Sequence, residues 1–138
     1  DDGVGPKSGR LVREKFAEKI DYREVCESGL GLIDFLTGYE KVLIIDAIEQ
    51  ELPPGTVVVF DASNLKPVRA SSAHSVGMPL ALELGRRCGV PLPSEITVIG
   101  VQVNDASFLS EVLTKEVEAA LPEVVEKAAP ILRAWLGE

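Results

Sequence analysis

The spacing of apolar residues alternates along the chain between the period of a helix and the run of a buried strand. Val12, Phe16 and Ile20 recur every four residues among charged neighbours, which predicts a helix with one apolar stripe. This helix is expected to begin near Pro6, because a proline in the first turn removes no hydrogen bond. A second long helix is predicted over Ser75–Arg87.

Glycines and prolines mark where helices are expected to end or bend. A short helix is predicted over Leu32–Leu36, with Gly38 ending it. Pro79 is expected to lie in the first turn of the second long helix, where it is tolerated. The C-terminal helical region contains Pro122 and Pro130, which we expect to kink or split it.

The clearest strand is predicted over Lys41–Ala47, a nearly continuous apolar run. Such a run is typical of a parallel strand that is covered on both faces. Further strands are predicted over Tyr22–Glu27, Thr56–Phe60 and Glu95–Val101. Strands that alternate with helices predict an α/β fold, with a mostly parallel twisted sheet in a three-layer α-β-α arrangement.

The opening residues, Asp1–Pro6, have the composition of a loop that leads from a strand into a helix. We therefore expect the natural protein to carry an N-terminal strand before Asp1, because a sheet without it would expose an unpaired edge. Residues 1–138 show no internal repeat or low-complexity tract and are expected to form a single domain.

Composition narrows the class of protein further. Hydrophobic residues make up 46% of the 138 residues, yet no apolar run approaches the roughly 20 residues that span a bilayer. The net charge of −8 argues against nucleic-acid binding, which needs clustered basic residues. Cys26 and Cys88 form neither a zinc-binding pattern nor a disulfide framework, so we interpret them as reduced thiols of a cytoplasmic protein.

Three residues have side chains that could together hold a transition metal: Asp2, Asp46 and His74, the sole histidine. Two carboxylates and one imidazole suit a divalent transition ion and leave coordination positions open. In α/β sheets, ligands collect at the carboxyl ends of the strands. Asp46 ends the strongest strand, Asp2 would follow the expected N-terminal strand, and His74 precedes a helix. All three could therefore face one crevice.

Each of these residues also has a plainer interpretation. Asp46 could accept hydrogen bonds from loop amides, or bind a nucleotide ribose. Asp2 could favour the positive end of the following helix, and His74 could cap a helix. Two whole-chain alternatives also stay open: a metal-assisted hydrolase of small molecules, and a nucleotide-binding or metallochaperone module.

Other catalytic arrangements have weaker support. The metalloprotease pattern His-Glu-x-x-His is absent. Serines are plentiful, so a Ser–His–Asp arrangement stays open, but the nucleophile elbow Gly-x-Ser-x-Gly is absent. A Cys–His pair is conceivable, although Cys26 in a predicted strand and Cys88 near a helix end are expected to be buried, inert thiols.

Several short segments occur in the order and approximate spacing of a known family. They are Asp1-Asp2-Gly3-Val4-Gly5, Leu43–Ile48, Ser72–Gly77, Ile99–Gln102 and the terminal helical stretch Leu113–Leu121. Together they resemble the hydrogenase maturation endopeptidases, which process the large subunit of nickel–iron hydrogenases. The similarity covers essentially the whole chain.

This resemblance implies that Asp2, Asp46 and His74 bind nickel already inserted in the hydrogenase large-subunit precursor. The substrate supplies the ion, and zinc or cadmium would be a substitute for it in a crystal. The resemblance also implies cleavage of a C-terminal extension after nickel loading, by an enzyme that we expect to be a monomer. Asp2 or Asp46 would activate water as a general base, or the ion would polarise the scissile carbonyl.

Overall fold

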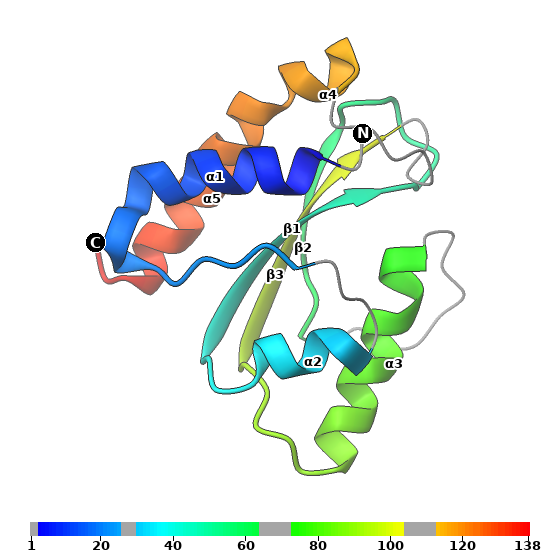
Figure 1. Cartoon of the computed structure of the whole chain (residues 1–138), viewed down its shortest axis with the longest axis vertical. Helices are drawn as coiled ribbons and strands as arrows, with labels where there is room; N and C mark the ends of the chain where they lie inside the picture. Colours follow the sequence, from blue (N-terminus) through cyan, green and yellow to red (C-terminus); the bar gives the residue numbers. More distant parts are fainter. Residues whose placement is uncertain (1–2, 26–29, 64–72, 104–112) are drawn as a thin grey trace. The chain divides into compact units, whose positions relative to one another are not determined.

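The computed structural model describes residues 3–25, 30–63, 73–103 and 113–138 (Figure 1). Its elements are, in chain order, α1 (Val4–Phe16), the 3-10 turn η1 (Ala17–Lys19), α2 (Leu30–Leu36), β1 (Lys41–Ile48), β2 (Val57–Asp61), α3 (Ala73–Arg87), β3 (Glu95–Gln102), α4 (Lys115–Ala119) and α5 (Leu121–Trp135). Helices and strands share the chain, so the predicted α/β class is confirmed. Within the described ranges, every helix is too short or too polar to cross a membrane.

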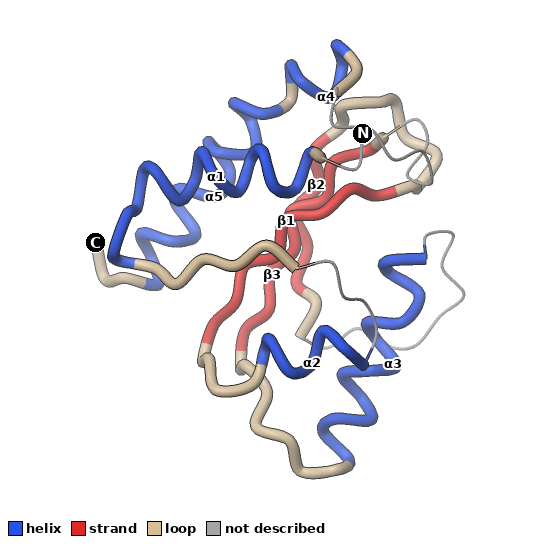
Figure 2. Tube along the Cα trace, viewed as in Figure 1, coloured by secondary structure: helices blue, strands red, loops and turns tan. Residues whose placement is uncertain are grey.

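The three strands form one sheet in the order β1-β3-β2 (Figure 2). β1 and β3 run parallel, as the hydrogen bonds between their corresponding ends show. Before the strands begin, the Ser94 amide donates to the Glu40 carbonyl at 2.8 Å. Where they end, the Val103 amide donates to the Ile48 carbonyl at 3.1 Å.

β2 runs antiparallel to β3. The Gln102 amide, at the end of β3, donates to the Thr56 carbonyl just before β2 at 2.9 Å. The sheet is therefore partly parallel, whereas the apolar runs alone indicated a mostly parallel one. The connection between β1 and β2 explains the difference: residues 49–56 link them directly, and a parallel crossover needs about a dozen residues or more.

The chain divides into two compact units, and each strand contributes residues to both. The first unit comprises Asp1–Glu24, Ile45–Val59 and Ile99–Glu138, and in it α1 packs against α5. Val12 and Phe16, from the predicted stripe, are buried, as that pattern predicts. From α5, the buried residues are Val124, Ala128, Ala129 and Leu132.

The second unit comprises Val25–Ile44 and Phe60–Val98, and in it α2 packs against α3. Gly38 follows α2 with a positive φ of 93°, which confirms that a glycine ends this helix. The core of the unit joins residues of both helices to residues in and beside the strands. Its buried members are Ile33, Leu36, Ala62, Met78, Ala81, Leu82, Ile96 and Val98.

The strand predicted over Tyr22–Glu27 is wrong for its described part, because residues 21–25 form no regular structure. Cys26 and Glu27 lie outside the described residues. The side chains of Tyr22 and Glu24 contact α1 instead of lying on one face of a sheet. Alternate residues of any extended segment point the same way, so a segment packed on a helix can imitate the pattern of a strand.

The helix predicted from Ser75 begins at Ala73, so Pro79 lies inside α3 rather than in its first turn. At the C-terminal end, the helical region is split into α4 and α5, with Pro122 in the first turn of α5. Pro130 lies inside α5 without ending it. Of the two prolines, only Pro122 therefore marks a division between helices.

Candidate active site

Asp46 is a half-buried residue of β1 in the first unit. Its Oδ1 accepts a hydrogen bond from the Ala47 amide at 2.9 Å. β1 ends at Ile48, two residues after Asp46, so Asp46 lies near the carboxyl end of the strand. The strand is longer than predicted because the Val103 amide holds the Ile48 carbonyl in the sheet.

The start of α1 packs directly on β1 beside Asp46. A Cβ atom added to Gly5 would lie 2.9 Å from the Ile45 carbonyl oxygen and 4.0 Å from the Asp46 Cα. Only a glycine permits so close an approach between helix and strand without a shift. Val4, the first residue of α1, is completely buried, which fixes this end of the helix in the first unit.

The other two predicted site residues have no described side chain. Asp2 lies outside the described residues, directly before Gly3, the N-cap residue of α1. His74 is the second residue of α3, in the second unit. Its side chain is likewise not among those that the structure describes. The convergence of Asp2, Asp46 and His74 on one ion therefore stays a prediction.

Among the residues whose side chains are described, no group of three His, Cys, Asp or Glu residues could hold a metal. Cys88 is an exposed free thiol after the end of α3, so its predicted burial is wrong. It lies beyond the last turn of the helix, where a side chain no longer faces the core. Cys26, the other thiol considered for a Cys–His pair, lies outside the described residues.

Gln102 is a buried polar residue that joins the ends of β1 and β3. Its side-chain Oε1 accepts the Gln50 amide at 2.7 Å, and its Nε2 donates to the Val103 carbonyl at 2.9 Å. Both polar atoms of the amide are therefore satisfied, as burial requires. Residues just beyond the end of β1 are held by this side chain, which sequence analysis treated only as part of a strand motif.

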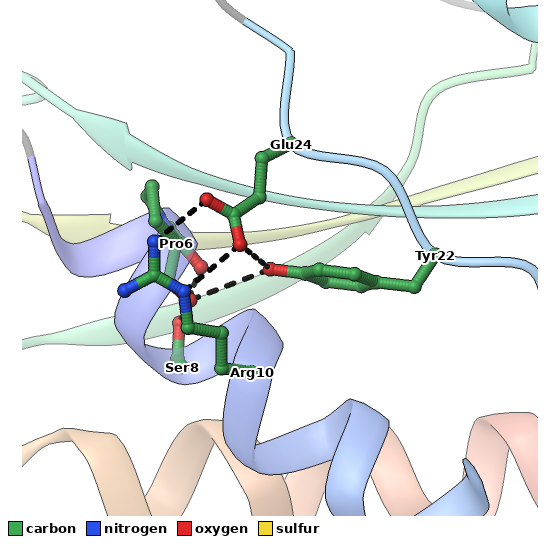
Figure 3. Close-up of polar contacts among 6 residues, drawn as sticks. Pro6, Ser8, Arg10, Tyr22 and Glu24 are labelled. Carbon is green, nitrogen blue, oxygen red and sulfur yellow. Dashed lines mark hydrogen bonds and ion pairs between the residues drawn. The ribbon is translucent and has the colours of Figure 1, made fainter.

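A second polar group, which sequence analysis missed, joins α1 to residues 22–24 (Figure 3). The Arg10 guanidinium binds both carboxylate oxygens of Glu24, with Nη2 to Oε1 at 2.8 Å and Nε to Oε2 at 2.9 Å. The Tyr22 hydroxyl donates to Glu24 Oε2 at 2.8 Å and lies 3.4 Å from the Pro6 carbonyl oxygen. The Arg13 guanidinium lies 5.5 Å from the centroid of the Tyr22 ring. We call Arg10, Tyr22 and Glu24 the α1 clamp.

Electrostatics within the α1 clamp reinforce its pairing. Hydrogen bonds from Arg10, and then from Tyr22, hold the pKa of the Glu24 carboxyl below its ordinary value. Burial, followed by the hydrogen bond to Glu24, raises the pKa of Tyr22 to about 12. The phenol therefore stays protonated as a donor, and the carboxylate stays ionised as an acceptor. No short sequence motif indicates this group, because Arg10 and Glu24 are far apart in the chain.

Comparison with known proteins identifies the family. A family model described as hydrogenase maturation protease matches residues 13–131. Protein FrxA of Pyrococcus furiosus is 33% identical to this chain, with 96% of each chain covered. The hydrogenase expression/formation protein HoxM of Cupriavidus necator is 28% identical, over 99% of this chain and 70% of that protein.

Solved structures agree with this result. The [NiFe] hydrogenase maturation protease HybD from Thermococcus kodakarensis matches with a TM-score of 0.66 and 32% identity, over 95% of this chain and 89% of that one. The hydrogenase maturating endopeptidase HybD from E. coli has a TM-score of 0.71 at 23% identity, over 96% and 84%, and supports the fold. The predicted family and the predicted endopeptidase class are thus confirmed. This chain belongs to the hydrogenase maturation protease family.

Proposed function

We propose that this protein removes the C-terminal extension of a nickel–iron hydrogenase large-subunit precursor once nickel has been inserted. Membership of the hydrogenase maturation protease family carries the general activity. The single structural observation that supports a site is the packing of the α1 start on β1 at Asp46. It brings Gly5, which follows Asp2 by three residues in the sequence, beside Asp46.

Nickel in the precursor is recognised, in this proposal, by Asp2, Asp46 and His74. Asp2 directly precedes Gly3, the N-cap residue of α1, in the sequence. Two carboxylates and an imidazole form a borderline-to-hard donor set that suits nickel and leaves positions open. Those positions let the precursor keep its own ligands on the ion while the protease binds.

Shared binding of one ion makes recognition conditional on nickel loading. A ligand shifts a binding equilibrium only by its differential interaction with the two states. Precursor without nickel lacks the bonds to Asp46 and His74, so it binds more weakly and is cut more slowly. Nickel is part of the substrate in this scheme, and the protease needs no resident metal.

Peptide hydrolysis then requires a water molecule to attack the scissile carbonyl. A carboxylate, Asp2 or Asp46, takes a proton from that water as general base and returns it to the leaving nitrogen. The substrate nickel polarises the carbonyl oxygen if the peptide lies within its coordination sphere. We further propose that the enzyme acts as a cytoplasmic monomer that meets its precursor transiently.

Processing of a purified precursor tests this function. Nickel-loaded and nickel-free precursor are incubated with the protein, and the mass of the large subunit is followed over time. We expect shortening of the loaded form only, and a loss of about 100-fold or more in rate for Asp46→Asn and His74→Ala. Asp34→Asn, which changes an exposed carboxylate on α2, is the matched control and should cleave normally. Normal cleavage by both site variants would disprove the site assignment.

A further inference from the structure

β2 is an outer strand of the sheet, and among the described residues β3 is its only strand neighbour (Figure 2). The two residues that flank β2 both bond to β3, through the Thr56 carbonyl at 2.9 Å and the Ala62 amide at 2.7 Å. Bonded positions alternate along an antiparallel pair. Val57, Val59 and Asp61 therefore direct their amides and carbonyls away from β3, toward the outer edge.

The sequence of β2 does not guard this edge. Proteins usually protect an outer strand with lysine, proline or a bulge, because its outward backbone groups can pair with another chain. Val57–Phe60 reads Val-Val-Val-Phe, which are residue types that favour strands, and its only charged neighbour in β2 is Asp61 at the last position. Val59 is 44% exposed and is the only strand residue among the exposed large apolar side chains of the described chain.

The surroundings of the start of β2 are acidic. A Cβ atom on Gly55, two residues before the strand, would lie 3.5 Å from the Glu116 Cβ, so α4 packs beside this end. Glu116 and Glu51 are both exposed, and residues 49–61 contain no lysine, arginine or histidine. A basic residue on an incoming strand would therefore be favoured here.

The register of the sheet relates this edge to Asp46. The hydrogen bond between the ends of β1 and β3 places Asp46 level with Gly100. A Cβ atom on Gly100 would lie 3.3 Å from the Val58 side chain, so Val58 is level with both. A strand added to β2 would lie three strand spacings from β1, or about 14 Å, which about four extended residues can span.

We propose that the outer edge of β2 is a docking strand for the C-terminal extension of the hydrogenase precursor. An extended apolar segment of the extension, carrying a basic residue, pairs with the outward backbone groups of Val57 and Val59. Backbone hydrogen bonds of this kind provide affinity for many extended peptides. This inference rests on the proposed function, which supplies the extension as the peptide. The docked segment lies about four residues or more from the bond that is cut, so it contributes to binding rather than to chemistry.

Hydrogen exchange of single amides tests the docking without any cleavage. The probe is a synthetic peptide with the sequence of the C-terminal extension of the precursor used in the processing assay. At saturating peptide, the amides of Val57 and Val59 are expected to exchange about tenfold more slowly, whereas those of Val58 and Phe60, which already face β3, keep their rates. Unchanged exchange at Val57 and Val59, or equal slowing at all four residues, would overturn the proposal.

Variants of Val59 test the docking in the enzyme. Val59→Pro removes an outward amide hydrogen without removing a bond to β3, so KM for nickel-loaded precursor is expected to rise about tenfold while kcat stays within about threefold. Val59→Ile keeps both the amide and the apolar side chain, and as the matched control it should change KM by less than about twofold. Val59→Lys keeps the backbone, adds the charge that guards natural outer strands, and should also raise KM if Val59→Pro proves unstable in urea. An unchanged KM in the folded Val59 variants other than the control would contradict the docking.

Charge reversal tests the preference for a basic residue. Glu116→Lys is expected to raise the dissociation constant of the peptide about tenfold. Glu126→Lys makes the same change at an exposed position on α5 and should leave that constant unchanged. Equal effects of the two reversals would overturn the charge complementarity.

Failure of this inference and failure of the proposed function are distinguishable. If the unaltered protein cuts nickel-loaded precursor but the peptide does not slow exchange at Val57 and Val59, the docking strand is wrong and the proposed function stands. If the unaltered protein does not cut the precursor, the proposed function is wrong. Slowed exchange at Val57 and Val59 alone would then still support an edge that takes up this peptide.

Discussion

Replacing Gly5 by alanine tests whether the contact between α1 and β1 sets the geometry around Asp46. The new Cβ would lie 2.9 Å from the Ile45 carbonyl oxygen, about 0.5 Å inside the 3.4 Å at which ordinary contact begins. The atom that it meets belongs to the backbone of a strand, so a side-chain rotation cannot relieve the overlap. The first turn of α1 must move instead.

The energetic cost can be bounded from two opposing effects. Overpacking costs about 1–3 kcal/mol, and the better helix propensity of alanine returns up to about 1 kcal/mol. The net loss therefore lies between about 0 and 3 kcal/mol, which leaves a domain of ordinary stability mostly folded. Urea unfolding followed by the fluorescence of Trp135, the sole tryptophan, measures this loss. Processing of nickel-loaded precursor should fall by more than the unfolded fraction explains.

Gly38→Ala is the matched control for this experiment. Gly38 has a positive φ of 93° and no atom near the position of an added Cβ, so alanine there introduces backbone strain without overlap. It should cost about 1 kcal/mol and leave the processing rate unchanged. Gly5→Ala with the stability and rate of the unaltered protein would refute the reasoning, as would equal losses of processing in the two variants.

Two further predictions concern pH and packing. Folding lowers the pKa of Glu24, so the unaltered protein should be more stable than Glu24→Gln above about pH 4.5, and this difference should disappear as the pH falls through the lowered pKa. Thermal melts of the two proteins across this pH range measure the difference. A difference that does not change with pH would contradict the pairing. Gly55→Ala combines a positive φ of 86° with a Cβ atom that would overlap the Glu116 carbonyl oxygen. It should cost about 3 kcal/mol or more, and an unchanged urea midpoint would disprove that contact.

Local patterns were sufficient for most of the elements. The apolar run that became β1, the stripe of Val12 and Phe16 and the glycine after α2 all act through neighbours within a few residues. These features are caused by burial, helical spacing and backbone conformation, and each of these can be inferred from the local sequence. The family resemblance likewise depends on local sequence, because its motifs are short segments that occur in a fixed order.

Features that depend on distant contacts could not be predicted. The direction of β2 depends on which strand it pairs with, and no local pattern indicates that its partner is β3. The extended segment at Tyr22 has the pattern of a strand, but its partner is a helix face. For the site, sequence supplied candidate residues and their chemistry, but only Asp46 has a described side chain, so their convergence stays a prediction.

The buried amide of Gln102 has a consequence for the alignment of β1 against β3. Nε2 donates to the Val103 carbonyl of the neighbouring residue, whereas Oε1 accepts the Gln50 amide beyond the end of β1, so the second of these bonds depends on the offset between the two strands. A slip of a single residue would reverse which face of the sheet every β1 side chain points to. The bond from the Gln50 amide to Gln102 thus favours the observed register, and with it the face of the sheet to which Asp46 points.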